Sequence, residues 1–423
     1  MLVDPSEVKR DHPLEPNMLE GDASSGSERI AARWAVPVAS ALVSLTAFGL
    51  IGELVTRYHE AHRESVPGTM PFLYYQHERL RVAMVRDHDY YGWVHVNAEG
   101  FRGPNAPLRK PDGVLRIMAV GGSTTFDAYV TSDRRAWPAR LELWLESLAR
   151  GRRVEVINAG VSGYRLLDNL IQLETELYQF RPDIVVLYVG HNDVFATLGQ
   201  AAARQKPATD TPNEMPTITP WERWLARHSL LYNKLLFRWK AVRFSRQQPP
   251  PLSDSSWARA IDNGAERFER ELTMFFAAAR ALGIRVVLPE VVHVSGPGSL
   301  TLSEPPLVRS FWQRTVPFAP PEVVLAAFAK FDAVARNVAC RFGETYIPLD
   351  GVGLAGDSLY AEGDPIHFND RGADRMARTL APALIASAIQ RSAGRETVGA
   401  ASHDANTPPL ASVKPCAAPP SPK

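Results

Sequence analysis

Short apolar runs and stretches of helical periodicity alternate along residues 113–392 of the chain. Short, mostly apolar runs predict strands at 114–120, 154–157, 184–189, 284–288 and 345–349, and the run 184–189 is continuous, as expected of a strand buried on both faces. Apolar positions spaced three and four residues apart predict helices at 137–150, 164–180, 257–282, 321–343 and 369–391. This alternation is typical of an α/β fold, here a three-layer αβα arrangement with a doubly wound, mostly parallel five-stranded sheet.

A long apolar segment precedes this region. Residues 34–52 contain no charged side chain, and an uncharged run of this length is long enough for a helix that crosses a membrane. A buried core helix and a cleaved signal peptide are the alternatives. We predict an uncleaved signal anchor at 34–55, with the N-terminus inside and the large C-terminal domain outside the cytoplasm, in the periplasm of a single-pass inner-membrane protein.

The remaining segments have the composition of tails and linkers. Residues 1–33 are polar and acidic, and residues 393–423 are rich in Ala, Pro and Ser, so we predict that both tails are disordered. A stalk is expected over 56–112. Residues 194–256 form an insertion that is too long for a plain connection within the catalytic region of 113–392.

The insertion contains a basic, aromatic helical pattern. From Thr219 to Arg246 the chain has seven Lys or Arg residues and one acidic residue. Two interpretations stay open: a helix packed over the domain with its basic side in solvent, or an interfacial helix that rests on anionic lipid headgroups. On one face of a single predicted helix lie Trp221, Trp224, Leu225, Tyr232, Leu235, Leu236 and Trp239.

Overall charge argues against a nucleic-acid partner. The 47 Lys and Arg residues are balanced by 46 Asp and Glu residues, so the net charge is only +1. A protein with this balance has no overall field that would attract a polyanion. We therefore predict no nucleic-acid partner.

Small polar clusters follow four of the predicted strands. Ser123 comes after Gly121-Gly122, Gly163 lies in the turn after the second strand, and Asn192 follows the third. Asp364 and His367 come shortly after the last strand. Because the carboxyl ends of parallel strands meet at one edge of a sheet, these side chains are expected to lie together.

The residue types in these clusters suit nucleophilic catalysis. A serine hydroxyl needs a neighbouring base, and that base needs an acid to orient it; His367 and Asp364 can supply both. The Ser123 N–H, the Gly163 N–H and the Asn192 amide are candidate donors to an oxyanion. Each cluster alone is more often an ordinary turn, so the hypothesis depends on their joint placement.

Other chemistries lack their motifs. The chain has no Gly-x-Ser-x-Gly around Ser123 and no P-loop. Gly190-His191-Asn192-Asp193 resembles a metallophosphoesterase signature, but no Asp-x-His follows the first strand, so we expect no metal and no cofactor. Glu290 and His293 are either a satisfied, half-buried pair or contacts to the substrate, and His191 is a further candidate contact.

At these positions the sequence resembles the SGNH hydrolase superfamily of GDSL-type esterases. The residues that name the superfamily match Ser123, Gly163, Asn192 and His367, and Asp364 completes the triad. The likeness covers about 113–392, although the family's Asp before the nucleophile is Gly122 here. The segment 97–103, Asn-Ala-Glu-Gly-Phe-Arg-Gly, resembles one that precedes the catalytic domain in membrane-anchored bacterial members.

The resemblance implies a flavodoxin-like fold and a membrane-anchored serine esterase. Such an enzyme would cleave acyl esters, O-acetyl or short acyl, of a glycan or lipid through an acyl-serine intermediate. Two alternatives remain open at this point. One is an O-acyltransferase that acts on a surface polysaccharide, and the other is a non-catalytic glycan-binding or assembly protein on the same scaffold.

Overall fold

The computed structural model divides into two compact units, Met1–His59 and Glu60–Lys423. The structure describes residues 23–61, 74–80, 82–90, 92–149, 151–203, 219–245, 252–294, 316, 318–349 and 352–396.

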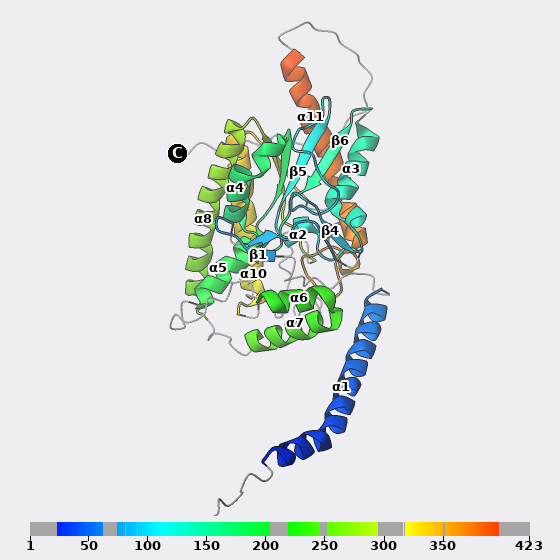
Figure 1. Ribbon diagram of the computed structural model, residues 1–423. Coiled ribbons are helices and arrows are strands. Elements are labelled where there is room, and N and C mark those ends of the chain that lie inside the picture. Colours follow the sequence, from blue (N-terminus) through cyan, green and yellow to red (C-terminus); the bar gives the residue numbers. More distant parts are fainter. Residues whose placement is uncertain are drawn as a thin grey trace, which may run out of the picture. The chain divides into compact units, whose positions relative to one another are not determined.

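A five-stranded parallel sheet forms the centre of the second unit (Figure 1). The strand order is β6-β5-β7-β8-β9, so the chain reverses its direction of winding between β5 and β7. The sheet therefore confirms the predicted doubly wound α/β class. The bounds are Leu115–Gly121 for β5, Val154–Asn158 for β6, Ile184–Tyr188 for β7, Arg285–Pro289 for β8 and Thr345–Ile347 for β9.

Helices cover both faces of this sheet, which gives the predicted three layers (Figure 1). On one face α3 (Trp137–Leu148) packs against α11 (Asp370–Glu396). The other face is covered by α4 (Leu166–Thr175), α5 (His191–Ala203), α8 (Asp254–Ala281) and α10 (Pro321–Phe342). Shorter elements are α2 (Ser123–Phe126), η2 (Asp133–Arg135), η3 (Leu177–Phe180) and η4 (Asp357–Leu359).

Part of the segment expected to be a stalk is folded against the catalytic region. Within 56–112, two antiparallel pairs form: β1 (Tyr74–Gln76) with β2 (Val82–Met84), and β3 (His88–Tyr90) with β4 (Val94–Val96). The apolar side chains of β2, β3 and β4 are buried in a second core cluster together with Phe126, Val161 and Tyr164. Strands of three residues are too short for a periodic pattern, which is why the sequence showed only a linker.

Within the insertion, residues 194–203 belong to α5, and the basic, aromatic stretch forms two helices rather than one. α6 (Pro220–His228) begins with a capping box between Thr219 and Glu222, and α7 (Leu230–Ser245) follows it directly. Between them Ser229 has an extended backbone, with φ of −129° and ψ of 113°. This conformation ends the first helix although the apolar spacing continues through it.

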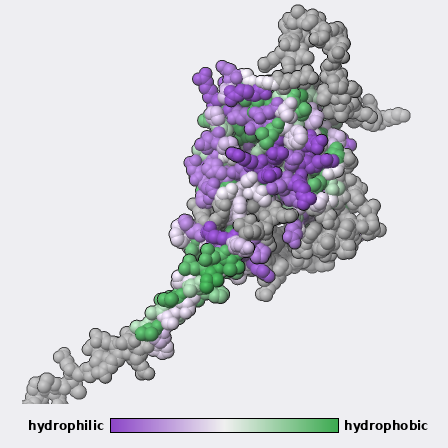
Figure 2. Space-filling view, turned by 90° about the vertical axis from the view of Figure 1, so that its right-hand side faces the viewer, coloured by the Kyte–Doolittle hydropathy of each residue, from purple (hydrophilic) through white to green (hydrophobic). Residues whose placement is uncertain are grey.

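The first unit contains one long helix, α1 (Ala23–Ala61). Its segment Trp34–His59 is long and apolar enough to cross a membrane, and none of that segment is buried. Figure 2 shows apolar residues gathered along part of this helix. A signal sequence near the N-terminus can meet the same criteria of length and apolar character.

The predicted tails are helical where the structure describes them. Residues 23–33 belong to α1, and residues 393–396 belong to α11, so neither stretch matches the expected disorder. The other residues of the two predicted tails, 1–22 and 397–423, lie outside the described residues.

Candidate active site

Ser123, His367 and Asp364 lie in hydrogen-bonding contact at the carboxyl edge of the sheet. Ser123 is the first residue of α2, two residues beyond the end of β5, and the other two lie in the loop before α11. His367 Nε2 is 2.7 Å from Ser123 Oγ, and His367 Nδ1 is 2.8 Å from Asp364 Oδ2. With its proton on Nδ1, the imidazole can accept the serine proton on Nε2.

Asp364 is held as a charged acceptor. Its Oδ1 accepts hydrogen bonds from the backbone N–H groups of Ile366 and His367, each 2.9 Å long. Burial alone would raise the pKa of Asp364, but the neighbouring imidazole and these hydrogen bonds together lower the pKa below its usual value. The carboxylate therefore stays ionised, as a group that orients and stabilises an imidazolium must.

Tyr129 supports the imidazole from its face. The two ring centroids are 4.8 Å apart, and the rings are inclined by 31°. A single tyrosine in a loop gives no pattern, so the sequence could not indicate this contact.

Asn192 reaches the nucleophile from the neighbouring strand. It follows β7, and its Nδ2 donates a 2.8 Å hydrogen bond to the carbonyl of Tyr164, next to Gly163. A Cβ placed on Gly122 would lie only 2.5 Å from Asn192 Nδ2, so only glycine allows this amide so close to the serine turn. Gly163 itself has a φ of +80°, a conformation that glycine adopts without strain. The structure thus brings the loops of all four predicted clusters together.

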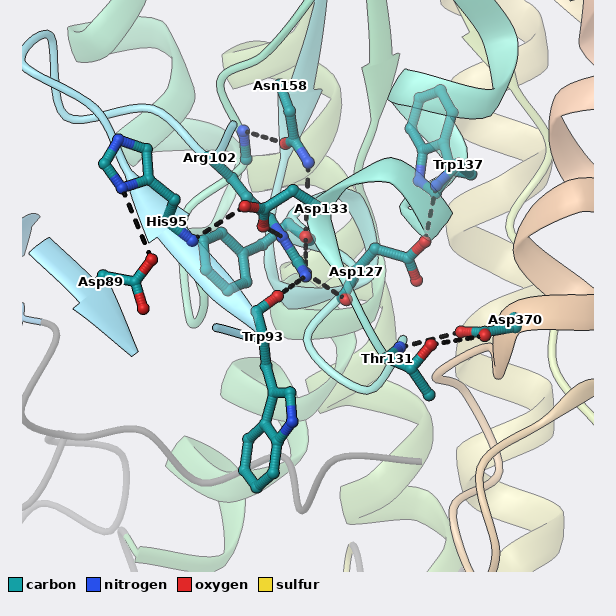
Figure 3. Close-up of polar contacts among 12 residues, drawn as sticks. Asp89, Trp93, His95, Arg102, Asp127, Thr131, Asp133, Trp137, Asn158 and Asp370 are labelled. Atoms are coloured by element: carbon teal, nitrogen blue, oxygen red, sulfur yellow. Dashed lines mark hydrogen bonds and ion pairs between the residues drawn. The ribbon is translucent and has the colours of Figure 1, made fainter. Parts of the chain in front are cut away.

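Arg102 fixes the far end of the nucleophile helix (Figure 3). Its guanidinium Nη1 donates to the carbonyls of Phe126 and Asp127, at 2.9 and 2.6 Å, where α2 ends. Its Nε donates to Asp133 over 2.7 Å, and its Nη2 donates to the carbonyl of Trp93 over 3.1 Å. The guanidinium carbon also lies 5.1 Å from the Phe126 ring centroid. One buried cation therefore joins the β3–β4 pair, η2 and the turn that carries Ser123.

Asp127 is a buried carboxyl group immediately beyond α2. Its Oδ2 accepts a 2.7 Å hydrogen bond from the Trp137 N–H at the start of α3 (Figure 3). Its Oδ1 has no hydrogen-bond partner among the described residues. Burial raises the pKa of Asp127 to about 7, although Arg102 and the Trp137 hydrogen bond oppose this rise. The predicted motifs did not include Asp127, because its burial depends on contacts that are distant in sequence.

A further link joins the serine loop to the histidine loop. Asp370 begins α11, three residues after His367, and accepts hydrogen bonds from both the N–H and the hydroxyl of Thr131 (Figure 3). These bonds are 2.9 and 2.6 Å long. Since Thr131 follows the serine turn, this contact helps to hold the two halves of the triad in register.

The three candidate substrate contacts are buried below the surface. Exposure of the His191, Glu290 and His293 residues is 3%, 3% and 4%. His191 Nε2 bonds the carbonyl of Val292, and Glu290 accepts from the N–H of Leu349. Burial lowers the pKa of His191 to about 3 and that of His293 to about 4. The structure favours the buried interpretation of these residues, although His191 Nδ1 has no hydrogen-bond partner among the described residues.

Among the residues that the structure describes, no group of three His, Cys, Asp or Glu side chains could hold a metal ion.

One family model matches more than half of the chain. Residues 119–375 match the model of the GDSL-like Lipase/Acylhydrolase family. No curated protein matches the chain. Solved structures that are similar to it include LAE5, an alpha/beta hydrolase enzyme from the metagenome of Lake Arreo in Spain, with 16% identity, a TM-score of 0.36, and coverage of 64% of this chain and 94% of that one. Axe2, an acetylxylan esterase from Geobacillus stearothermophilus, has 12% identity, a TM-score of 0.37, and coverage of 63% and 91%.

Proposed function

We propose a reaction for this chain from the premise that it belongs to the GDSL-like lipase/acylhydrolase family, whose members hydrolyse esters. The proposal is a serine esterase reaction through an acyl-serine intermediate. The observation that supports it is the pair of short contacts that connects Ser123 through His367 to Asp364, at 2.7 and 2.8 Å.

In the first half-reaction, the Ser123 oxygen attacks the ester carbonyl while its proton passes to His367 Nε2. The resulting imidazolium is stabilised by the ionised Asp364, and it then gives the proton to the departing alcohol. The acyl group stays on Ser123. In the second half-reaction, His367 takes a proton from water as the water oxygen attacks the acyl carbonyl. The bond between the acyl group and the Ser123 oxygen then breaks, the imidazolium returns the proton to that oxygen, and the acid is released with the serine hydroxyl restored.

The negative charge that develops on the carbonyl oxygen needs donors that are already in position. We propose the Ser123 N–H, the Gly163 N–H and the Asn192 side-chain amide for this role. The Ser123 amide is the first of a helix, and such amides lack an intrahelical acceptor. Asn192 Nδ2 carries two hydrogens, and the Tyr164 carbonyl accepts only one of them.

The finer proposal concerns place and substrate. We propose that α1 is an uncleaved anchor in the inner membrane and that the catalytic unit acts outside the cytoplasm. This is supported by the length and apolar character of Trp34–His59. The substrate class is acyl esters of a glycan or lipid, with an O-acetyl or other short acyl group.

Ester hydrolysis by the purified full chain tests this proposal. The chain is incubated with nitrophenyl esters of increasing acyl length and with an acetylated glycan, and the released alcohol and acid are measured. We expect hydrolysis that Ser123→Ala abolishes without a change in unfolding temperature. Equal activity of the variant would contradict the proposed nucleophile, and transfer of the acyl group to a sugar without release of acid would indicate the transferase instead.

A further inference from the structure

Helices α6 and α7 expose bulky apolar side chains. On α6 these are three residues apart, and on α7 they are four residues apart, so each pair lies on one helix face. Exposed fractions near 60% are unusual for large apolar residues, and such residues grouped together mark interaction surfaces. We call this group the α6–α7 face: Trp221 (61%), Trp224 (60%), Leu235 (58%) and Trp239 (57%).

The opposite sides of both helices hold them against the catalytic unit. Ala226 on α6 and Leu230 on α7 are 0% and 1% exposed, and they belong to the same buried cluster as Phe126 and Tyr164. Asn233, one turn along α7, is also buried, with 3% exposure. Because the opposite sides of α6 and α7 pack on the core, the α6–α7 face is directed away from it.

This face flanks the active site. Phe126 is the last residue of the helix that begins with Ser123, and Tyr129 packs against the same cluster while its ring stacks on His367. Figure 1 shows α6 and α7 side by side at the end of the sheet where α2 lies. A surface that docks through the α6–α7 face would therefore lie at the catalytic end of the sheet.

The charge of residues 219–246 indicates which kind of surface the α6–α7 face binds. Thr219 to Arg246 carries seven basic residues and one acidic residue, whereas the whole chain has 47 and 46. Tryptophan side chains interleaved with Lys and Arg are typical of helices that lie at the headgroup level of a membrane. Each basic residue near an anionic leaflet strengthens binding about five-fold. A neutral protein partner would not need this local excess of positive charge.

We propose that the α6–α7 face docks on an anionic lipid bilayer and so holds the active site at that surface. Apolar side chains of the face enter the headgroup layer, and Lys234 and Arg238 on α7 face its negative charge; Arg238 is exposed, and Lys234 is half-buried. The functional role of this docking rests on the proposed esterase activity, because it would bring the active site to esters at the membrane surface. The docking itself requires no catalysis, so the two proposals fail independently.

Quenching of tryptophan fluorescence by brominated lipids tests the docking in the full chain. The protein is reconstituted in phosphatidylcholine vesicles with or without phosphatidylglycerol, in which the acyl chains do or do not carry bromine. Subtracting the emission of the Trp221→Phe/Trp224→Phe variant isolates the signal of these two residues. We expect this signal to be quenched by bromine in the anionic vesicles and to recover at high salt. No difference between brominated and plain lipids would overturn the proposal.

Matched charge variants separate docking from general attraction. Lys234→Gln/Arg238→Gln should weaken docking about 25-fold, because two basic residues are lost from the surface. Arg152→Gln/Arg153→Gln removes the same charge from exposed positions at the start of β6, the opposite end of the sheet, and should leave quenching unchanged. Equal effects of the two pairs would overturn the proposal. So would a Trp221 and Trp224 signal that is shielded from water without being quenched by lipid, since another protein surface would then cover the face.

Discussion

Replacement of Arg102 by methionine tests the link between the β3–β4 region and the nucleophile. Met keeps an unbranched apolar side chain but removes the guanidinium, which lies over the Phe126 ring and is bonded to Asp133 over 2.7 Å; the Arg102 side chain is 1% exposed. Removal of one partner from a buried ion pair costs about 3–5 kcal/mol of folding free energy. The Phe126 carbonyl keeps a 3.3 Å hydrogen bond from Asn158 Nδ2, so the largest local loss falls at the Asp127 carbonyl.

The catalytic effect should exceed what lost stability explains. The Asp127 and Phe126 carbonyls end the single turn that starts at Ser123, so their release lets the hydroxyl move relative to His367. A displacement of about 1 Å in a catalytic group can lower the rate about 100-fold. We therefore expect kcat to fall about that much at temperatures where the variant is fully folded, with a smaller change in KM.

Arg116 provides the matched control. It is also fully buried, its Nε lies 2.6 Å from Glu155, and its Nη1 donates to the carbonyl of Phe180 over 2.7 Å. However, it lies at the start of β5, whereas Ser123 follows the end of that strand. Arg116→Met should lose a similar stability in urea unfolding and keep its kcat. Equal losses of kcat in the two variants would refute the positioning role of Arg102.

Three further predictions concern the same site. Asn192→Ala should lower kcat about 10²- to 10³-fold, because an oxyanion donor is lost, while circular dichroism shows a folded chain; a change only in KM would contradict this role. Gly122→Ala should lower kcat at least about ten-fold, since its Cβ would lie 2.5 Å from Asn192 Nδ2; normal turnover would show that the amide is not needed there. The Asp127 carboxyl keeps its proton in the folded chain up to about pH 7, whereas the unfolded chain loses it near pH 4, so folding stability falls by up to ~4 kcal/mol as the pH rises through that window. The free energy of unfolding, measured in urea at about pH 4 and about pH 7, should therefore fall less in Asp127→Asn than in the natural chain. An equal fall in both proteins would show that the carboxyl is already ionised in the folded chain.

The strands and the triad were visible in the sequence for a physical reason. A parallel strand covered on both faces is mostly apolar, so 114–120, with Arg116 as its single charged residue, and 184–189 stand out as apolar runs and match β5 and β7 within one residue. Ser123, Asn192 and His367 follow strands or lie in short loops, and parallel topology gathers such positions at one edge. Local pattern and global fold agree at these residues.

The supporting contacts were not visible, because they join segments that are distant in sequence. The strands β1 to β4 contain three residues each, and a strand of three residues is too short to show a periodic pattern of apolar positions. Arg102 reads as a surface cation until its partners Trp93, Asp127 and Asp133 are known. The protonation state of Asp127 likewise depends on burial by residues that are distant in sequence.

The insertion shows a different limit of pattern reasoning. Its apolar spacing continues through Ser229, so periodicity alone predicts one helix with one buried apolar face. In the structure, Ala226 and Leu230 provide the buried side, and Trp221 and Trp224 are exposed. Which face of an amphipathic helix meets the core depends on the surface that it packs against.

Covalent labelling of Ser123 tests the central claim most directly. The full chain is incubated with a fluorophosphonate, and the modified peptide is located by mass spectrometry. The arrangement of Ser123, His367 and Asp364 predicts one adduct on Ser123 that is lost in His367→Ala, a variant that retains the hydroxyl. Labelling of another residue, or undiminished labelling of Ser123 in the His367 variant, would contradict the proposed activation of the serine.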